Sequence, residues 1–274
     1  MRIALCNEVV RDLSIPDQAR LAAGLGYHGL EIAPFTLGEE PHRLPMERRR
    51  EVRSMVEDAG LRITGLHWLL VTPDGLSITA RDPAVIERTV GVMRALVELC
   101  HDLGGSYLVH GSPKQRAVVP GDTVGTASAR AADAFAQVAP AAEQAGVVYL
   151  IEPLARSETE VINTVDEAVA IVDAVASPAL LTMIDACAAA QSEDDPVPAL
   201  IERWVPTRRI GHIHLNDRNR KAPGQGRIRF RPILEALSRT RYAGWCGVEP
   251  FVYEPDGPTS AARAVGYLQG LLED

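Results

Sequence analysis

The sequence predicts an α/β fold: a single (β/α)8 barrel with its active site at the C-terminal ends of the strands. Two observations support this prediction. Short apolar runs recur along the 274 residues and alternate with amphipathic helical patterns. Most of these runs end at or near an ionisable side chain, in the order Glu31, His67, His110, Glu152, Asp185, His214 and Glu249. Polar groups at the ends of successive parallel strands are typical of a barrel whose catalytic residues gather at one face.

The elements follow from these patterns in chain order. The expected strands are the apolar runs at residues 1–6, 26–32, 61–67, 106–110, 146–152, 180–185, 210–215 and 244–249. Helices are expected where apolar residues recur at intervals of three or four, at 17–26, 46–60, 83–105, 126–146, 164–175, 197–204, 230–244 and 259–274. Several of these helices end in a glycine that suits a left-handed C-cap, namely Gly26, Gly60, Gly104, Gly146 and Gly244. Irregular stretches at 35–45, 71–83, 111–122 and 216–230 follow strands, so we expect the functional loops there.

The composition favours a single domain that spans residues 1–274. Hydrophobic residues make up 46% of the chain and are evenly spread, with no run near the ~20 apolar residues of a membrane span. The start MRIALCNEVV is typical of a first strand and not of a secretory signal, so we expect a cytoplasmic protein. The four cysteines lack CxxC spacing, which favours core residues over disulfides or a zinc knuckle. A net charge of −8 opposes binding to phosphate backbones, so nucleic acid is not an expected partner.

The strongest chemical pattern is a set of four residues at the ends of strands five to eight. Glu152, Asp185, His214 and Glu249 would place three carboxylates and one imidazole in one crevice. Such a concentration of negative charge requires a cation or protonation. Oxygen-rich ligation with one nitrogen suits Mn²⁺ or Mg²⁺ more than a closed structural zinc site. Co²⁺ and Zn²⁺ are the alternative ions. The alternative for any single residue is an acid that faces solvent or caps the following helix.

Four motifs give the chain a family resemblance. They are IEPL at 151–154, MIDA at 183–186, GHIHLNDRNR at 211–220 followed by PGQGRIRF at 223–230, and GVEPF at 247–251. On these motifs the chain resembles the xylose isomerase-like barrel superfamily, and within it the sugar isomerases and ketose 3-epimerases. The resemblance implies that Glu152, Asp185, His214 and Glu249 bind one divalent metal, with Mn²⁺ the first expectation. We expect His212, on the same strand face, to be a packed core residue one layer deeper.

The same resemblance implies a reaction. Glu152 and Glu249 correspond to the acid/base pair that moves a proton through an enediolate in a ketose or keto-sugar derivative. Glu158 and Arg220 match positions that hydrogen-bond the substrate, although Arg220 lies in a loop and has an alternative interpretation as a solvated charge. The family also suggests a homodimer or tetramer; the sequence itself says nothing about assembly.

Three further residues are expected to border the substrate. His67 and His110 add imidazoles that can serve as substrate ligand, general acid or second metal ligand. Trp68 offers a flat apolar face for a sugar, with core packing as the alternative. One departure is informative: Ala188 stands where the ketose 3-epimerases have a substrate-binding His. A buried substrate oxygen would lose a partner worth about 1–3 kcal/mol, which argues against epimerisation of a free ketohexose.

Other functions remain open at this point. A metal-dependent dehydratase or lyase acting on a keto-inositol or 3-keto glycoside uses the same enolising chemistry. A zinc-dependent apurinic endonuclease shares the barrel and uses histidines of strands three and four, but it needs a further His at the position of Ala188. A non-catalytic sugar-binding barrel is the third alternative, and three converging carboxylates speak against it.

Overall fold

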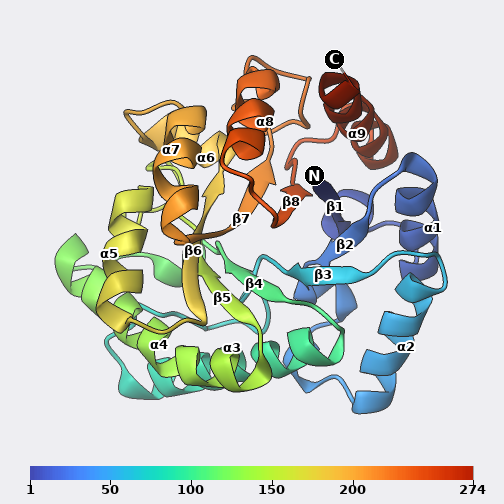
Figure 1. The fold of residues 1–274 in the computed structure, drawn as a ribbon. Helices are drawn as coiled ribbons and strands as arrows, with labels where there is room; N and C mark the ends of the chain where they lie inside the picture. The colour runs from blue at the N-terminus through green and yellow to red at the C-terminus, as the bar shows by residue number, and fades with distance from the viewer. Residues whose placement is uncertain (274) are drawn as a thin grey trace.

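The computed structural model describes residues 1–273 and shows a closed barrel of eight parallel strands (Figure 1). The strands are β1 Arg2–Cys6, β2 Gly29–Ile32, β3 Ile63–Leu66, β4 Tyr107–His110, β5 Val148–Ile151, β6 Leu180–Asp185, β7 Ile210–Leu215 and β8 Trp245–Val248. Each strand pairs with the next along the chain, and β8 closes the barrel by pairing with β1. The predicted fold class is therefore confirmed.

Helices surround the barrel (Figure 1). They are α1 Ile15–Leu25, α2 Met46–Glu57, α3 Pro83–Asp102, α4 Val124–Ala145, α5 Val165–Val175, α6 Ala186–Ser192, α7 Val197–Trp204, α8 Phe230–Arg239 and α9 Gly257–Glu273. Short 3-10 turns are η1 Asn7–Val10, η2 Pro34–Leu37, η3 Pro41–Arg43, η4 Lys114–Arg116 and η5 Val205–Thr207. All but one of the helices lie where the periodic pattern predicted them.

Two local predictions need correction. Helix α6 was not predicted, because it begins directly after β6 and is too short for an apolar period to show. Gly244 does not provide the left-handed cap of α8; that helix ends at Arg239, and Arg241 adopts the positive φ of 52°. A Cβ at Gly244 would collide with the phenol of Tyr242, so close packing explains that glycine instead.

Side chains divide between the barrel interior and the sheet–helix layer. A small apolar cluster fills the interior, with Ala4, Tyr107, Val109, Leu150, Met183 and Trp245. The larger core lies between the strands and the helices. Because side chains alternate along a strand, neighbours of an inward residue face this outer layer. This alternation decides which of the strand-end polar groups reach the site.

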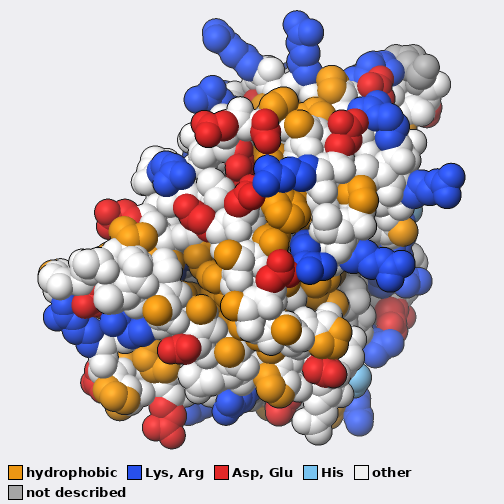
Figure 2. All heavy atoms as spheres, turned by 60° about the vertical axis from the view of Figure 1, so that its left-hand side comes forward, with side chains coloured by type: hydrophobic (Ala, Val, Ile, Leu, Met, Phe, Trp, Pro, Cys, Tyr) orange, Lys and Arg blue, Asp and Glu red, His pale blue; other side chains and the backbone are white. Residues whose placement is uncertain are grey.

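The cysteines agree with one sequence expectation, and two surface features can be described beside them. Cys6, Cys100, Cys187 and Cys246 are buried and free, as expected for core residues. Within residues 1–273 there is no helix with both the length and the apolar character to cross a bilayer. On the face shown in Figure 2, basic side chains are interspersed with acidic ones and do not form a continuous basic surface.

Candidate active site

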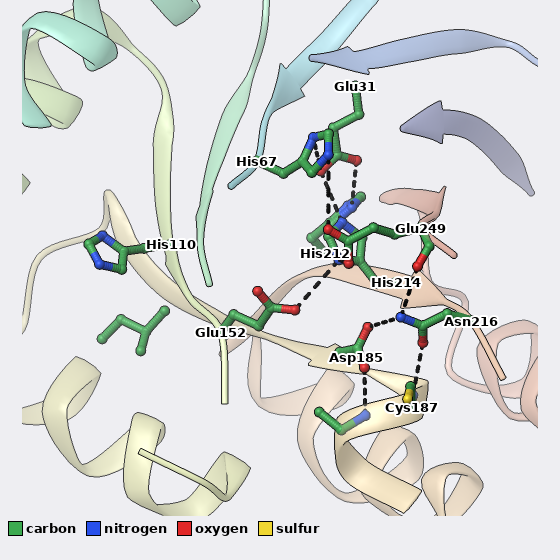
Figure 3. A network of polar contacts seen from close by, with 12 residues as sticks. Glu31, His67, His110, Glu152, Asp185, Cys187, His212, His214, Asn216 and Glu249 are labelled. Atoms are coloured by element: carbon green, nitrogen blue, oxygen red, sulfur yellow. Dashed lines mark hydrogen bonds and ion pairs between the residues drawn. The ribbon is translucent and has the colours of Figure 1, made fainter. Parts of the chain in front are cut away.

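The four predicted ligands converge at the C-terminal ends of β5–β8 (Figure 3). One ligand atom from each of Glu152, Asp185, His214 and Glu249 lies within 4.8 Å of the others. The Nδ1 atom of His214 is 2.9 Å from Oε2 of Glu249 and 3.6 Å from Oε1 of Glu152. The structure therefore brings together the whole set that the sequence pattern singled out.

Several polar atoms of this cluster lack hydrogen-bond partners and could bind a divalent cation. Although His214 Nδ1 and Oε2 of Glu249 lie 2.9 Å apart, this contact does not have the geometry of a hydrogen bond. These two atoms and Oε1 of Glu249 are buried and have no hydrogen-bond partner among the described residues. A buried polar atom without a partner is costly, and three carboxylates with one imidazole form a common donor set for divalent metals. The residues present thus suit a bound divalent metal ion.

Asp185 is held from both sides. Its Oδ1 accepts the N–H of Ala188 at 2.6 Å and caps helix α6, and its Oδ2 accepts the Asn216 amide at 2.6 Å. Asn216 in turn accepts the N–H of Cys187 at 2.9 Å. Asp185 is therefore both a helix cap and a member of the site. The role of Asn216 was not predicted, because its only signal in the sequence is its place directly after β7.

Glu31, which lies deeper in the barrel than the four predicted ligands, fixes the orientation of His214. Its Oε1 lies 3.0 Å from Nε2 of His214, while its Oε2 accepts the Tyr107 hydroxyl at 2.7 Å and lies 3.0 Å from Nε2 of His212. Since Nε2 of His214 faces Glu31, Nδ1 is the nitrogen left to face the other carboxylates. His212 occupies the deeper layer, as expected, with its ring 4.3 Å from that of Tyr107.

A strand glycine makes room for this lower layer. A Cβ at Gly247 of β8 would lie 2.7 Å from Oε2 of Glu31 and 2.9 Å from the His214 ring. Glycine inside a strand often marks a close approach of this kind. The glycine in the WCGV sequence of β8 is thus a sequence signal for the buried cluster.

The pKa values of Asp185 and Glu249 in the ligand cluster shift in the opposite direction to that of Glu31, which lies deeper in the barrel. Burial raises the pKa of Asp185, and the nearby charge of Glu152 raises it further. Burial also raises the pKa of Glu249, and the neighbouring His214 only partly offsets this effect. For Glu31, burial is outweighed by His212 and His214, which hold its pKa well below the usual range. Glu31 is therefore ionised at neutral pH, whereas Asp185 and Glu249 hold protons more readily than free carboxyl groups when no cation is present.

His110 does not reach the site, which corrects the expectation that it contacts substrate. Its Nδ1 is 2.8 Å from the Tyr149 hydroxyl, and its ring meets Phe135 of α4 edge-on at 5.1 Å. Figure 3 shows the imidazole directed away from the carboxylates. Tyr107 and Val109 of β4 face the barrel interior. Because side chains alternate along a strand, His110 faces the layer between the strands and the helices. Burial holds its pKa well below the usual value.

His67 lies inside the barrel but does not line the cavity of the site. Its Nε2 is 2.7 Å from Oε2 of Glu8 and 3.9 Å from Oε1 of Glu249. The ring is fully buried and does not border the cavity beside Glu152. A direct contact between His67 and substrate stays a prediction.

A cavity of about 480 Å³ opens next to Glu152 and Asp185. Three of the predicted substrate residues border it, namely Trp68, Glu158 and Arg220, together with apolar groups that include Leu154, Ala188 and Phe251. The Arg220 guanidinium lies 3.4 Å from the Glu158 carboxylate and stacks over the Phe251 ring at 4.7 Å. The Trp68 and Phe251 rings are stacked with centroids 5.7 Å apart. The cavity thus combines one polar wall with one aromatic wall.

Two residues missed by the sequence analysis position Glu152. The buried guanidinium of Arg116 donates to the backbone carbonyls of Glu152 at 2.8 Å and His110 at 2.6 Å. Burial lowers the pKa of Arg116 to about 10, which leaves it charged at neutral pH. Gly111 has no space for a side chain, because a Cβ there would collide with the Glu152 carboxylate. Both follow β4 directly in the loop of residues 111–122, but nothing in that loop sequence indicates what they contact.

Comparison with known proteins agrees with this architecture. The family model described as the xylose isomerase-like TIM barrel matches residues 19–271. This chain belongs to that family. Among curated relatives, D-psicose 3-epimerase of Enterocloster bolteae is 27% identical over 237 residues, which cover 85% of this chain and 75% of the relative.

Solved structures share the fold over the full length. A D-psicose 3-epimerase crystal structure determined in the presence of D-fructose superposes with a TM-score of 0.85 at 19% identity, covering 100% of both chains. The 3-keto-D-glucoside 4-epimerase of E. coli superposes with a TM-score of 0.84 at 19% identity, covering 98% of this chain and 99% of the other. At these identities the structural likeness shows the fold alone.

Proposed function

We propose that this member of the family is a divalent-metal-dependent sugar isomerase or epimerase that acts on a ketose or keto-sugar derivative. The observation that supports this most is the convergence of Glu152, Asp185, His214 and Glu249 beside a closed-in cavity. The curated relative from Enterocloster bolteae carries the name of an epimerase, which agrees with the same chemistry. We propose Mn²⁺ as the ion, because oxygen-rich ligation with a single nitrogen suits it.

The chain's own residues account for the proton transfers. A divalent ion held by the four ligands would act as a Lewis acid and acidify the C–H next to a substrate carbonyl. Glu152 and Glu249 extend from β5 and β8 and reach the same His214 nitrogen from different strands. One carboxylate can remove the proton, and the other can return a proton to the enediolate from a different direction. Glu158 and Arg220 would bind substrate oxygens, and Trp68 with Phe251 would cover an apolar face of the sugar.

A second candidate is favoured by one feature of the cavity. Ala188 stands where the ketose 3-epimerases have a histidine, so the wall of the cavity beside Asp185 carries a small apolar side chain there. A keto-sugar with a glycosidic substituent, or a keto-inositol, would use that wall better than a free hexose does. With such a substrate the same enolisation can end in elimination, and the chain would then be a dehydratase or lyase. The position of His110 outside the barrel speaks against the endonuclease alternative, which needs that residue as a metal ligand.

Proton exchange in D₂O, followed by NMR, tests the proposal. The Mn²⁺-loaded protein would be offered ketoses, keto-inositols and 3-keto glycosides. We expect deuterium at carbon next to the carbonyl, and the identity of the product separates isomerase, epimerase and lyase. Absence of exchange on the whole panel, in a protein shown to hold its metal, would refute enolising chemistry on these classes and favour a binding barrel.

A further inference from the structure

A second carboxylate–imidazole group lies beside the first and shares Glu249 with it. It consists of Glu8 from η1, His67 after β3 and Glu249 after β8, with one ligand atom of each within 4.8 Å of the others. We propose that Glu8, His67 and Glu249 bind a second divalent cation, Mn²⁺ or Mg²⁺, next to the first site. This proposal concerns cation binding only and does not depend on which reaction the site performs.

The two oxygens of Glu249 face different imidazoles. Oε2 lies 2.9 Å from Nδ1 of His214, and Oε1 lies 3.9 Å from Nε2 of His67. Each imidazole nitrogen also faces a second carboxylate: Glu152 at 3.6 Å for His214, and Glu8 at 2.7 Å for His67. The arrangement of the first group is thus repeated on the other side of Glu249. A carboxylate in this position can bridge two metal ions, as in two-metal sites.

Unpartnered atoms point to a ligand in the second group. Oε1 of Glu8 and Oε1 of Glu249 are buried and have no hydrogen-bond partner within the part of the chain that the structure describes. The three residues are 2%, 1% and 0% exposed for Glu8, Glu249 and His67, so bulk water does not solvate these oxygens. A buried carboxylate oxygen without a donor is strongly unfavourable, and a cation would supply the missing interaction.

The deeper carboxylate of Glu31 lies behind both imidazoles, closer to His214 than to His67. Its Oε1 lies 3.0 Å from Nε2 of His214 and 3.8 Å from Nδ1 of His67. Each ring therefore turns one nitrogen toward Glu31 and the other toward the upper carboxylates. Metal-ligating histidines commonly have a carboxylate behind the ring that fixes the tautomer. Glu31 does this for His214 through a hydrogen bond, whereas Nδ1 of His67 has no hydrogen-bond partner among the described residues.

Neighbouring groups with similar residue types do not fit a cation as well. In the lower group with His212 and His214, both oxygens of Glu31 already have hydrogen-bond partners, the Tyr107 hydroxyl at 2.7 Å and Nε2 of His214 at 3.0 Å. The group formed by Cys6, Glu31 and His67 offers a thiol, whereas Mn²⁺ and Mg²⁺ prefer oxygen ligands.

The charge of the cluster also favours two cations. Glu8, Glu31, Glu152, Asp185 and Glu249 place five carboxylates in one connected buried region. A single divalent ion neutralises two of these charges, whereas a pair of ions neutralises four. The rival arrangement is a proton on His67 that forms an ion pair with Glu8 and leaves the second site closed.

Counting bound Mn²⁺ decides between these arrangements. Metal-free full-length protein would be loaded with Mn²⁺ and desalted, and the metal content per chain measured by inductively coupled plasma mass spectrometry. We expect two ions in the wild type, and an electron paramagnetic resonance spectrum altered by coupling between them. Glu8→Gln should lose one ion and show the hyperfine pattern of isolated Mn²⁺. Glu254→Gln, which removes an exposed carboxylate paired with Lys221, is the matched control and should keep both.

One ion per wild-type chain, with an uncoupled spectrum, would overturn the second site and identify the Glu8–His67 contact as a protonated ion pair. If Glu8→Gln does not fold, His67→Gln replaces it, and the wild-type count is decisive by itself. Because no substrate is used, the result is separate from the proposed reaction. A one-ion protein that exchanges deuterium would retain the isomerase proposal and lose only this inference.

Discussion

The two halves of the barrel treat their strand-end polar residues differently. On β5–β8, all four such residues turn inward and meet, as Glu152, Asp185, His214 and Glu249. On β2–β4 the three residues have three separate fates. Glu31 lies in a deeper layer, His67 contacts Glu8, and His110 leaves the interior.

The difference teaches that the face of a strand-end residue matters as much as its position along the strand. Side chains alternate across a strand, so a shift of one residue moves a polar group from the barrel interior to the helix layer. His110 sits one residue past inward-facing Val109, whereas Glu152 sits two residues past inward-facing Leu150. Both look alike in the sequence, as the polar end of an apolar run.

The largest effect is expected for the two glutamates that we propose transfer protons, at the ends of β5 and β8. Glu152→Gln or Glu249→Gln should lower turnover by about 10²-fold or more, since each removes a proton-transferring group and a ligand. Circular dichroism should show an intact fold, and metal content should be measured in parallel. Near-normal turnover in either variant would show that the acid/base assignment is wrong.

A second test concerns the loop that holds Glu152 in place. Gly111→Ala places a methyl group against the Glu152 carboxylate, so that side chain must move. We expect a loss of about 1–3 kcal/mol in the free energy of unfolding, and a clear loss of turnover and metal affinity. Gly91→Ala is the control: that helical glycine has open space around its Cβ position, and the substitution should be neutral or slightly stabilising. Equal behaviour of the two variants would contradict the proposed crowding.

A third test asks whether the deeper layer supports the upper one. Glu31→Gln keeps the shape but removes the negative charge behind His214, and should weaken Mn²⁺ binding by about 10- to 100-fold. Isothermal titration calorimetry measures this directly. Asp102→Asn breaks the Arg49–Asp102 ion pair between α3 and α2, and serves as a control for general destabilisation. If both variants lower thermal stability but leave metal affinity unchanged, Glu31 has only a structural role.

Much of this arrangement could be predicted from the sequence, and the rest depends on contacts that a pattern does not encode. The alternation of apolar runs and amphipathic stretches was sufficient for the barrel, because each βα unit contains its own local signal. The Glu152–Glu249 set was predictable because short motifs mark it. Asn216, Arg116 and Gly111 were missed, since their roles arise from residues brought close only by the closed barrel. The outward direction of His110 needed the register of β4.

Removal of the metal should reveal the raised pKa values of the inward carboxyls, about 7 for Asp185 and about 8 for Glu249. The unfolded chain releases these protons near pH 4, whereas the folded metal-free protein keeps them until pH reaches those higher values. The metal-free protein should therefore lose stability as pH rises from about 5 to about 8. Mn²⁺ must displace the same protons, so its affinity should fall as pH drops through this range, by up to about tenfold per pH unit for each proton. Thermal melts with and without Mn²⁺ at several pH values measure both trends; a flat metal-free profile would contradict them.

The smallest effect on activity is expected in the half of the barrel where the sequence pattern misled. His110→Ala removes the hydrogen bond to Tyr149 and the edge contact with Phe135, and should cost about 2–3 kcal/mol of folding free energy. The imidazole points away from the cavity, and the backbone carbonyl that holds Arg116 remains. The metal-loaded variant should therefore keep kcat and KM within about twofold at temperatures well below its melting point. A large loss of kcat in a folded, metal-loaded variant would mean that the outer layer controls the position of Glu152 more tightly than the division into inward and outward residues allows.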